Sequence, residues 1–434
     1  MFKQNGLSLD QAPPLTVVFS FFFLASLFGI LAGVLLFFYG KQIFVAKSMA
    51  AVTFTHVLTL GVMLSFMFAA LFQMLPVIAG VSLSSPQKRS KLLLYPFVLG
   101  VLSLLLAFNL SSSWLYILSG LLLGLALFGI LIPMLSKLLT LQNHSPSSKG
   151  MTLSLLSLLL VLLLAFYLLF SLSGLNDATY YAEVKTAHYS FGLFAWITLL
   201  IISISFQTIE MFYVTPEYPK LVTKYLGLGL VLILFVSSVL SFFHPNIFFY
   251  TDILMLLMLS TYALLTLKRL SQKKRPLSDA TVWFWRLGLV SLLFSMLSVL
   301  LQYATAYPPL KALSYIFFTS FALSIVFAMF YKIVPFLTWF HLNAQGYFTA
   351  PMMHEVIHPK TAKKHLYIHV TTLVTFLLSL YISWFIYLAA GLMILSFSWL
   401  AYQIIHAHHL YKETQKTGEK FSMNITQDIT QSSN

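Results

Sequence analysis

Twelve long runs of apolar residues divide this sequence, and they constrain its fold more than any other feature. Each run is close to the roughly 20 apolar residues that an α-helix needs to cross a bilayer, and all exceed the strands of a membrane β-barrel. The runs cover residues 15–38, 49–80, 92–109, 112–135, 151–174, 187–214, 221–243, 247–268, 283–304, 310–340, 366–388 and 389–411. The sequence therefore predicts an all-α polytopic membrane protein of about twelve transmembrane helices.

The composition excludes a water-soluble protein. Hydrophobic residues make up 59% of the 434 residues and charged residues only 8%, whereas soluble domains carry about 25% charged residues. The chain has no cysteine, which removes disulfides, thiolate metal sites and cysteine nucleophiles. Its twelve histidines are then the side chains that could bind a soft metal ion or haem iron.

The net charge of +14 reflects topology and not a nucleic-acid partner. When the twelve runs are threaded through a membrane, most of the 25 lysines and arginines fall on the side of the N-terminus. Only Lys41, Lys47, Lys185 and Lys311 fall on the other side. Because cytoplasmic loops are enriched in Lys and Arg, we expect a multi-pass protein of a bacterial inner membrane, with the lipid bilayer as its partner and both termini in the cytoplasm.

A short motif recurs every four runs. It stands near the cytoplasmic ends of the second, sixth and tenth runs, as Phe72-Gln73, Phe206-Gln207 and Phe330-Tyr331, with spacings of 134 and 124 residues. The alternative is chance similarity, because aromatic residues are common at helix ends near the membrane interface. A true repeat would place the second helix of each unit around a shared interior, where repeated membrane folds tend to place their sites.

The repeat predicts one transmembrane domain, residues 15–411, built as three four-helix arcs. The arcs cover about 15–135, 151–268 and 283–411. A cytoplasmic N-terminal segment, 1–14, precedes them. The polar residues 412–434 are expected to form a disordered cytoplasmic tail.

Three histidines fall at a similar depth near the outer face, and they are candidate cofactor ligands: His56, His188 and His244. His56 lies inside an otherwise apolar run, where an ionisable side chain marks a functional site by default. Neutral imidazole can bind haem iron or copper. The alternative for His56 is a hydrogen bond to a neighbouring helix, and for the other two a position in the interface, in contact with water.

A second histidine pair falls on the cytoplasmic side. His365 and His369 share a helix face through their i,i+4 spacing, and such a pair can chelate a divalent metal ion. Lys360, Lys363 and Lys364 flank the pair and would oppose a cation. We therefore favour a solvated basic loop that faces lipid headgroups.

Two charged residues stand near the cytoplasmic ends of apolar runs. Glu210 belongs to the sixth run and Lys332 to the tenth. The repeat points both toward the shared interior, where they could form an ion pair or take up protons. The alternative is that each side chain extends to the membrane surface.

These features together resemble subunit I of the haem–copper oxidases, and more closely its non-oxidase relatives of the NnrS type. The resemblance lies in the twelve helices, the three arcs and the outer histidines, over most of residues 15–411. Its local strings are His56-Val-Leu-Thr-Leu-Gly61, His188-Tyr-Ser-Phe-Gly192 and Tyr331-Lys-Ile-Val-Pro335. It implies that haem, copper or both are bound in the membrane.

The resemblance also implies individual roles. His56 matches the haem ligand of the second helix, His188 resembles the copper ligand of the sixth, and His244 resembles a remnant of the paired histidines of the seventh, so His188 and His244 are the candidate copper ligands. However, the outer half of the tenth run has no histidine, and Gly192 stands where an oxidase has tyrosine. A complete binuclear centre, and with it a functional terminal oxidase, is not expected.

Three functions remain open from the sequence. The first is metal or haem handling, or a response to nitric oxide or respiratory stress, with respiratory-chain or metal-handling proteins as partners. The second is a secondary transporter, because twelve helices with an internal repeat also fit a permease. The third is an assembly partner of a respiratory complex.

Overall fold

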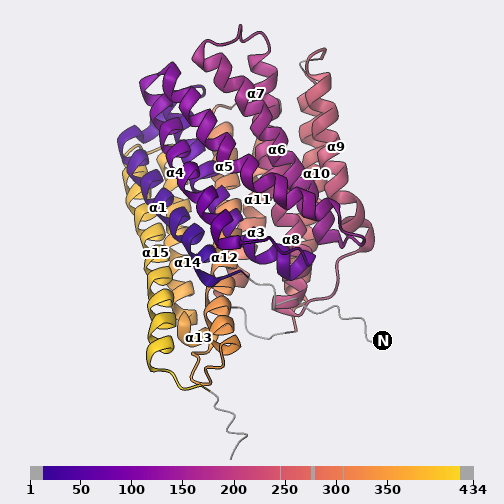
Figure 1. Cartoon of the computed structure of the whole chain (residues 1–434). Helices are drawn as coiled ribbons and strands as arrows, with labels where there is room; N and C mark the ends of the chain where they lie inside the picture. The colour runs from indigo at the N-terminus through magenta and orange to yellow at the C-terminus, as the bar shows by residue number, and fades with distance from the viewer. Residues whose placement is uncertain (1–12, 245, 275–278, 306, 421–434) are drawn as a thin grey trace, which may run out of the picture.

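The computed structural model describes residues 13–244, 246–274, 279–305 and 307–420 (Figure 1). These residues form a helical bundle without a β-strand. Most of the predicted N-terminal segment and residues 421–434 of the predicted tail lie outside the described residues. The last helix continues to Thr417, so the beginning of the predicted tail is helical.

The helices follow the apolar runs closely. Their bounds are α1 Leu15–Tyr39, η2 Gly40–Phe44, α2 Met49–His56, η3 Val57–Leu64, α3 Ser65–Ala79, α4 Pro86–Leu110, α5 Ser113–Leu139, α6 Pro146–Ser173, α7 Tyr181–Ser190, η4 Phe191–Thr198, α8 Leu199–Tyr213, α9 Lys220–Leu240, α10 Ile247–Ser271, α11 Ala280–Thr305, α12 Pro309–Ala344, α13 Met353–Val356, α14 Pro359–Ser379 and α15 Phe385–Thr417. Two continuous helices change pitch in the middle, because η3 and η4 are π-helical turns.

Eleven helices of the described chain are long and apolar enough to cross a membrane. They confirm eleven of the twelve predicted runs. The remaining run, residues 366–388, corresponds to α14, whose 21 residues suffice to span the bilayer at about 1.5 Å per residue but whose first half is rich in lysine and histidine. Figure 1 shows α1 beginning and α15 ending toward the same end of the bundle, which fits an even number of crossings.

The boundary between the last two helices was predicted in the wrong place. The sequence suggested a break at 388–389, whereas the chain turns at residues 380–384. Tyr381 and Trp384 in this turn are exposed. Because these aromatic residues are apolar enough to continue a hydrophobic run, hydropathy alone does not reveal the turn.

The first and last long helices pack closely through glycine. Gly29 and Gly33 are four residues apart on α1, the spacing that lets helix backbones approach in a membrane. A Cβ atom on Gly29 would lie 2.1 Å from the Phe397 ring, and one on Gly33 would lie 2.6 Å from Ile394 and 3.1 Å from the carbonyl of Ala390. The close contact between α1 and α15 therefore requires glycine, which has no side chain, at both positions.

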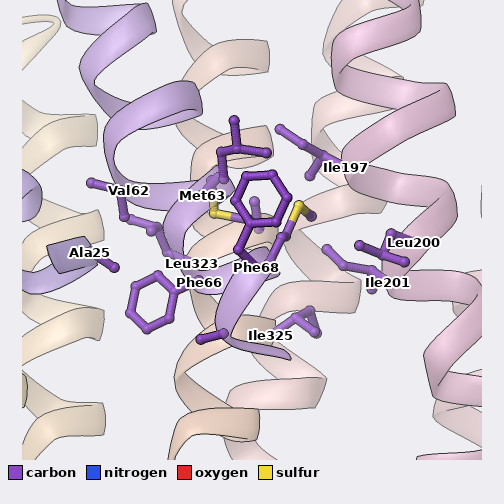
Figure 2. Close-up of a cluster of buried hydrophobic side chains, with 14 of the residues drawn as sticks. Ala25, Val62, Met63, Phe66, Phe68, Ile197, Leu200, Ile201, Leu323 and Ile325 are labelled. Carbon is purple, nitrogen blue, oxygen red and sulfur yellow. The ribbon is translucent and has the colours of Figure 1, made fainter. Parts of the chain in front are cut away.

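The second helices of the three predicted arcs meet in the centre of the bundle. Figure 2 shows Phe66, Leu200 and Ile325 in one buried apolar cluster. Ring centroids of Phe66 and Phe327 are 6.1 Å apart. This centre leaves a cavity of about 50 Å³ between α1, α3, α8, α11 and α12. The shared interior exists, and its lining is almost wholly apolar.

Substitution of Gly33 by alanine should destabilise the protein. The new Cβ collides with Ile394 and the α15 backbone, and overpacking of this kind costs about 1–3 kcal/mol. A thermal unfolding midpoint in detergent, followed by tryptophan fluorescence, measures the loss. The matched control is Gly391→Ala on α15, where a Cβ meets nothing within 4 Å. Equal midpoints for the two variants would contradict the close approach.

Candidate functional site

The structure brings two of the three outer histidines together. His56 ends α2, and His188 lies in the last turn of α7. Their ring centroids are 6.4 Å apart, and the ring planes differ by 18°. The two side chains come from helices that are 132 residues apart in the sequence, so this pair is a product of the fold.

The same hydrogen-bonding pattern orients both rings. Nδ1 of His56 donates to the carbonyl of Val52 at 2.8 Å, and Nδ1 of His188 donates to the carbonyl of Val161 on α6 at 3.1 Å. A carbonyl oxygen can only accept, so Nδ1 carries the hydrogen in each ring. In the neutral imidazole, Nε2 then has the free lone pair. A backbone carbonyl on the opposite nitrogen is also the usual support of a metal-binding histidine.

A π-helical turn follows each of these histidines. The turns η3 and η4 begin one residue after His56 and three residues after His188. They are offset by 134 residues at both ends, the same spacing that separates Phe72 from Phe206. π-Helical turns occur frequently at functional sites. The corresponding helix of the third arc, α12, has no π-helical turn.

The surroundings of the pair are apolar. The ring of Phe108 on α4 packs against His56 with centroids 4.9 Å apart. Within the described chain, no three His, Asp or Glu side chains are grouped so that they could hold a metal ion. The site therefore offers two imidazole nitrogens without a carboxylate or a third histidine.

His244 does not join the pair. It is exposed in the turn between α9 and α10, and it forms no three-residue metal group with His56 and His188. The sequence analysis selected the three histidines because it placed them at a similar depth. Depth, however, does not say which helices are neighbours.

Glu210 and Lys332 do not pair with each other. The Lys332 ammonium lies 2.6 Å from Oδ2 of Asp279, just before α11, and Glu210 accepts a hydrogen bond of 2.8 Å from the Tyr218 amide. The suggested ion pair between these two residues is therefore wrong. Each charged side chain contacts a different residue close to it in space. The partner of Lys332, Asp279, is 53 residues away in the sequence.

The interpretation of His365 and His369 as a solvated loop is also wrong. They lie on α14 and are 0% and 5% exposed. Nε2 of His365 is hydrogen-bonded to Ser396 on α15 at 2.7 Å, and Nε2 of His369 to Ser324 on α12 at 2.9 Å. The shared helix face was predicted correctly. The flanking lysines are exposed, so the helix face that carries the two histidines is buried in the bundle.

The Lys332–Asp279 contact should make stability depend on pH. Burial raises the pKa of the Asp279 carboxyl. The charge of the Lys332 ammonium, together with hydrogen bonds from Lys332, Thr281 and the Val282 amide, outweighs burial and holds the pKa below its usual value. A depressed pKa stabilises the fold above the unfolded pKa, about 4, and the benefit is lost as the pH falls through the folded pKa. Because Asp279 is 42% exposed, we expect Asp279→Asn to cost about 1 kcal/mol or less at neutral pH.

Thermal midpoints of wild type and Asp279→Asn between pH 7 and pH 3 test this expectation. The two curves should converge at the acid end. The control is the double variant Asp279→Asn with Lys332→Met, whose loss should be smaller than the sum of the single losses. Additive losses, or a constant difference at all pH values, would argue against the ion pair.

No protein-family model matches the sequence, and no curated protein matches it either. Its function must therefore be inferred from the geometry of its own residues.

Proposed function

We propose that this chain is an integral membrane protein that binds one transition-metal centre through Nε2 of His56 and Nε2 of His188. The observation that carries the proposal is the pairing of the two rings, 6.4 Å apart, with both Nδ1 atoms on backbone carbonyls. Metal–imidazole bonds are about 2 Å long. Two rings that share one ion through Nε2 would have centroids about 6 Å apart, which is close to the separation of this pair.

Copper is the ion that fits this pair best. Imidazole suits copper, zinc, iron and nickel. Zinc sites use three or four protein ligands, and no such group occurs among the described residues. A singly charged copper ion also costs less to bury in apolar surroundings than a divalent one. When bound, copper would supply one-electron chemistry or affinity for a small gas molecule.

Haem iron is the second candidate, because it uses the same imidazole nitrogens. The central cavity is about 50 Å³, whereas pockets for ligands of this general size measure about 300–1,000 Å³. A porphyrin therefore does not fit in that cavity. If haem is bound, it belongs at the outer end of the bundle, at His56 and His188.

The residues around the pair have definable tasks. The carbonyls of Val52 and Val161 fix the ring orientations, and Phe108 excludes water from one side of His56. The described outer half of α12 has no histidine, so we do not propose a terminal oxidase. We propose metal or haem handling, or a response to nitric oxide or respiratory stress, in a bacterial inner membrane with both termini in the cytoplasm.

The test is the metal content and optical spectrum of the detergent-purified protein. We expect one copper per chain in wild type. Loss of either ligand, in His56→Ala or His188→Ala, should weaken copper binding by about 100-fold or more, because even an outer partner of a metal ligand is worth 10–100-fold. Titration with Cu(I) against a competing chelator measures the affinity.

The matched control is His244→Ala, which removes an exposed histidine outside the pair and should bind copper like wild type. A Soret band that disappears in His56→Ala would assign haem iron in place of copper. Protein that binds neither metal nor haem, yet carries a solute across liposomes, would replace the proposal by a transporter. Stable co-purification of such metal-free protein with a respiratory complex would favour an assembly partner.

A further inference from the structure

A carboxylate stands near the predicted outer end of α10 without a positively charged partner. Asp252 lies five residues after the first residue of this helix, or about 7–8 Å along the helix axis. Among the described residues it forms no ion pair, since the carboxylates that do are Asp279 and Glu413. An ionisable side chain in a membrane-spanning helix is usually paired or functional. Asp252 is therefore a candidate site for a cation that does not belong to the chain.

One hydrogen bond fixes the orientation of this carboxylate. The hydroxyl of Tyr303, near the end of α11, donates to Oδ2 of Asp252 at 2.7 Å. Because a phenol hydroxyl is uncharged, this bond holds the carboxylate in place without neutralising it. No hydrogen bond within the described chain ends on the other oxygen, Oδ1. The side chain is only partly buried, so Oδ1 is available to a ligand at the membrane surface.

Three aromatic rings stand near the carboxylate. Phe249 precedes Asp252 by three residues on α10, a spacing that places both on one helix face. Its ring packs against that of Tyr303, with centroids 5.1 Å apart and planes 78° apart. Tyr189 on α7 is close enough to interact electrostatically with both Asp252 and Tyr303. Three helices therefore bring aromatic side chains to one acidic residue.

This grouping differs from the scattered tyrosines that are common at a membrane interface. Tyr189 and Tyr303 are 48% and 50% exposed, so the core does not cover their rings. No lysine or arginine of the described chain stacks on these two rings or on Phe249. The faces of aromatic rings attract cations, and the carboxylate adds a full negative charge. Both features favour a positively charged ligand.

An organic ammonium group suits this position better than a metal ion. Calcium binds six to eight oxygen ligands, whereas Asp252 belongs to no group of three acidic or histidine side chains within the described chain. A primary ammonium needs fewer partners, because one N–H can donate to a carboxylate oxygen while an aromatic face attracts the charge. The depth of Asp252, one to two turns into its helix, is that of the lipid headgroups.

We propose that Asp252, Tyr303, Phe249 and Tyr189 bind a primary ammonium group at the predicted outer end of the bundle. Oδ1 of Asp252 accepts an N–H of the ammonium, and the aromatic rings provide further attraction. An aminophospholipid headgroup and a soluble amine both present this group. Binding is non-covalent, so no bond is formed or broken. The inference goes beyond metal binding, shares no residue with the histidine pair and does not rest on it.

Calorimetric titration of the full-length protein in detergent tests the proposal. The probes are dihexanoyl phosphatidylethanolamine and free ethanolamine, which carry a primary ammonium, and dihexanoyl phosphatidylcholine, whose quaternary nitrogen has no N–H. We expect phosphatidylethanolamine to bind about tenfold more tightly than phosphatidylcholine, or better, because only the first can donate to Oδ1. Binding of ethanolamine with similar affinity would identify the ligand as a soluble amine. Binding of the lipid alone would identify it as the headgroup.

Two variants connect the binding to these residues. Asp252→Asn removes the charge but retains an oxygen that can accept from Tyr303, and it should weaken binding about tenfold or more. Tyr303→Leu removes one aromatic ring and the hydroxyl that orients the carboxylate, and it should weaken binding about fivefold. Because the Tyr303 side chain is half-exposed, this second variant tests the site even if Asp252→Asn does not fold.

The matched control is Asp177→Asn, which removes a carboxylate from the loop between α6 and α7, where it accepts from the amide of Thr179. This variant should bind like wild type. Each variant is first shown to elute as a single species with wild-type circular dichroism. The absence of saturable binding for both ammonium probes would overturn the proposal. So would equal affinity for phosphatidylcholine, or an affinity that Asp252→Asn leaves unchanged or Asp177→Asn lowers equally.

Discussion

The absence of water in the hydrocarbon core is the constraint on which this structure depends. A backbone polar group that faces lipid must find its partner within its own helix, and a polar side chain must find one within the protein or reach the membrane surface. The apolar runs therefore become helices, and the sparse polar residues turn inward. Lys332 forms an ion pair with Asp279 at one end of the bundle, and His56 donates a hydrogen bond to the carbonyl of Val52 near the other end.

The same constraint sorts four histidines into two pairs of opposite character. In His56 and His188 the backbone occupies Nδ1, which leaves the more accessible nitrogen, Nε2, for a ligand. In His365 and His369 serine hydroxyls occupy Nε2, and Nδ1 of His365 is left unpaired. The first arrangement leaves one Nε2 lone pair on each ring for the metal ion that we propose the two rings share. The second connects each ring to a hydroxyl group on a neighbouring helix, which fixes both rings inside the bundle.

Hydropathy predicted the fold because each helix satisfies its own backbone, a property that is local in sequence. All twelve runs correspond to helices, and the one misplaced boundary lies in an aromatic turn that hydropathy cannot distinguish from helix. The site was less predictable because its decisive contacts are not local. The ring pair joins residues 132 positions apart, and the carbonyl of Val161 comes from a third helix. The burial of His369 depends on Ser324, 45 positions away. The π-helical turns could not be predicted, because no sequence motif marks them.

The central helices of the three predicted arcs carry different groups. The first two arcs each combine a histidine with a π-helical turn at nearly the same position, at His56 with η3 and at His188 with η4. The third arc has neither in the first half of α12, which instead carries hydroxyls that face α11 and α14. The proposed metal site therefore draws both of its ligands from the first two arcs.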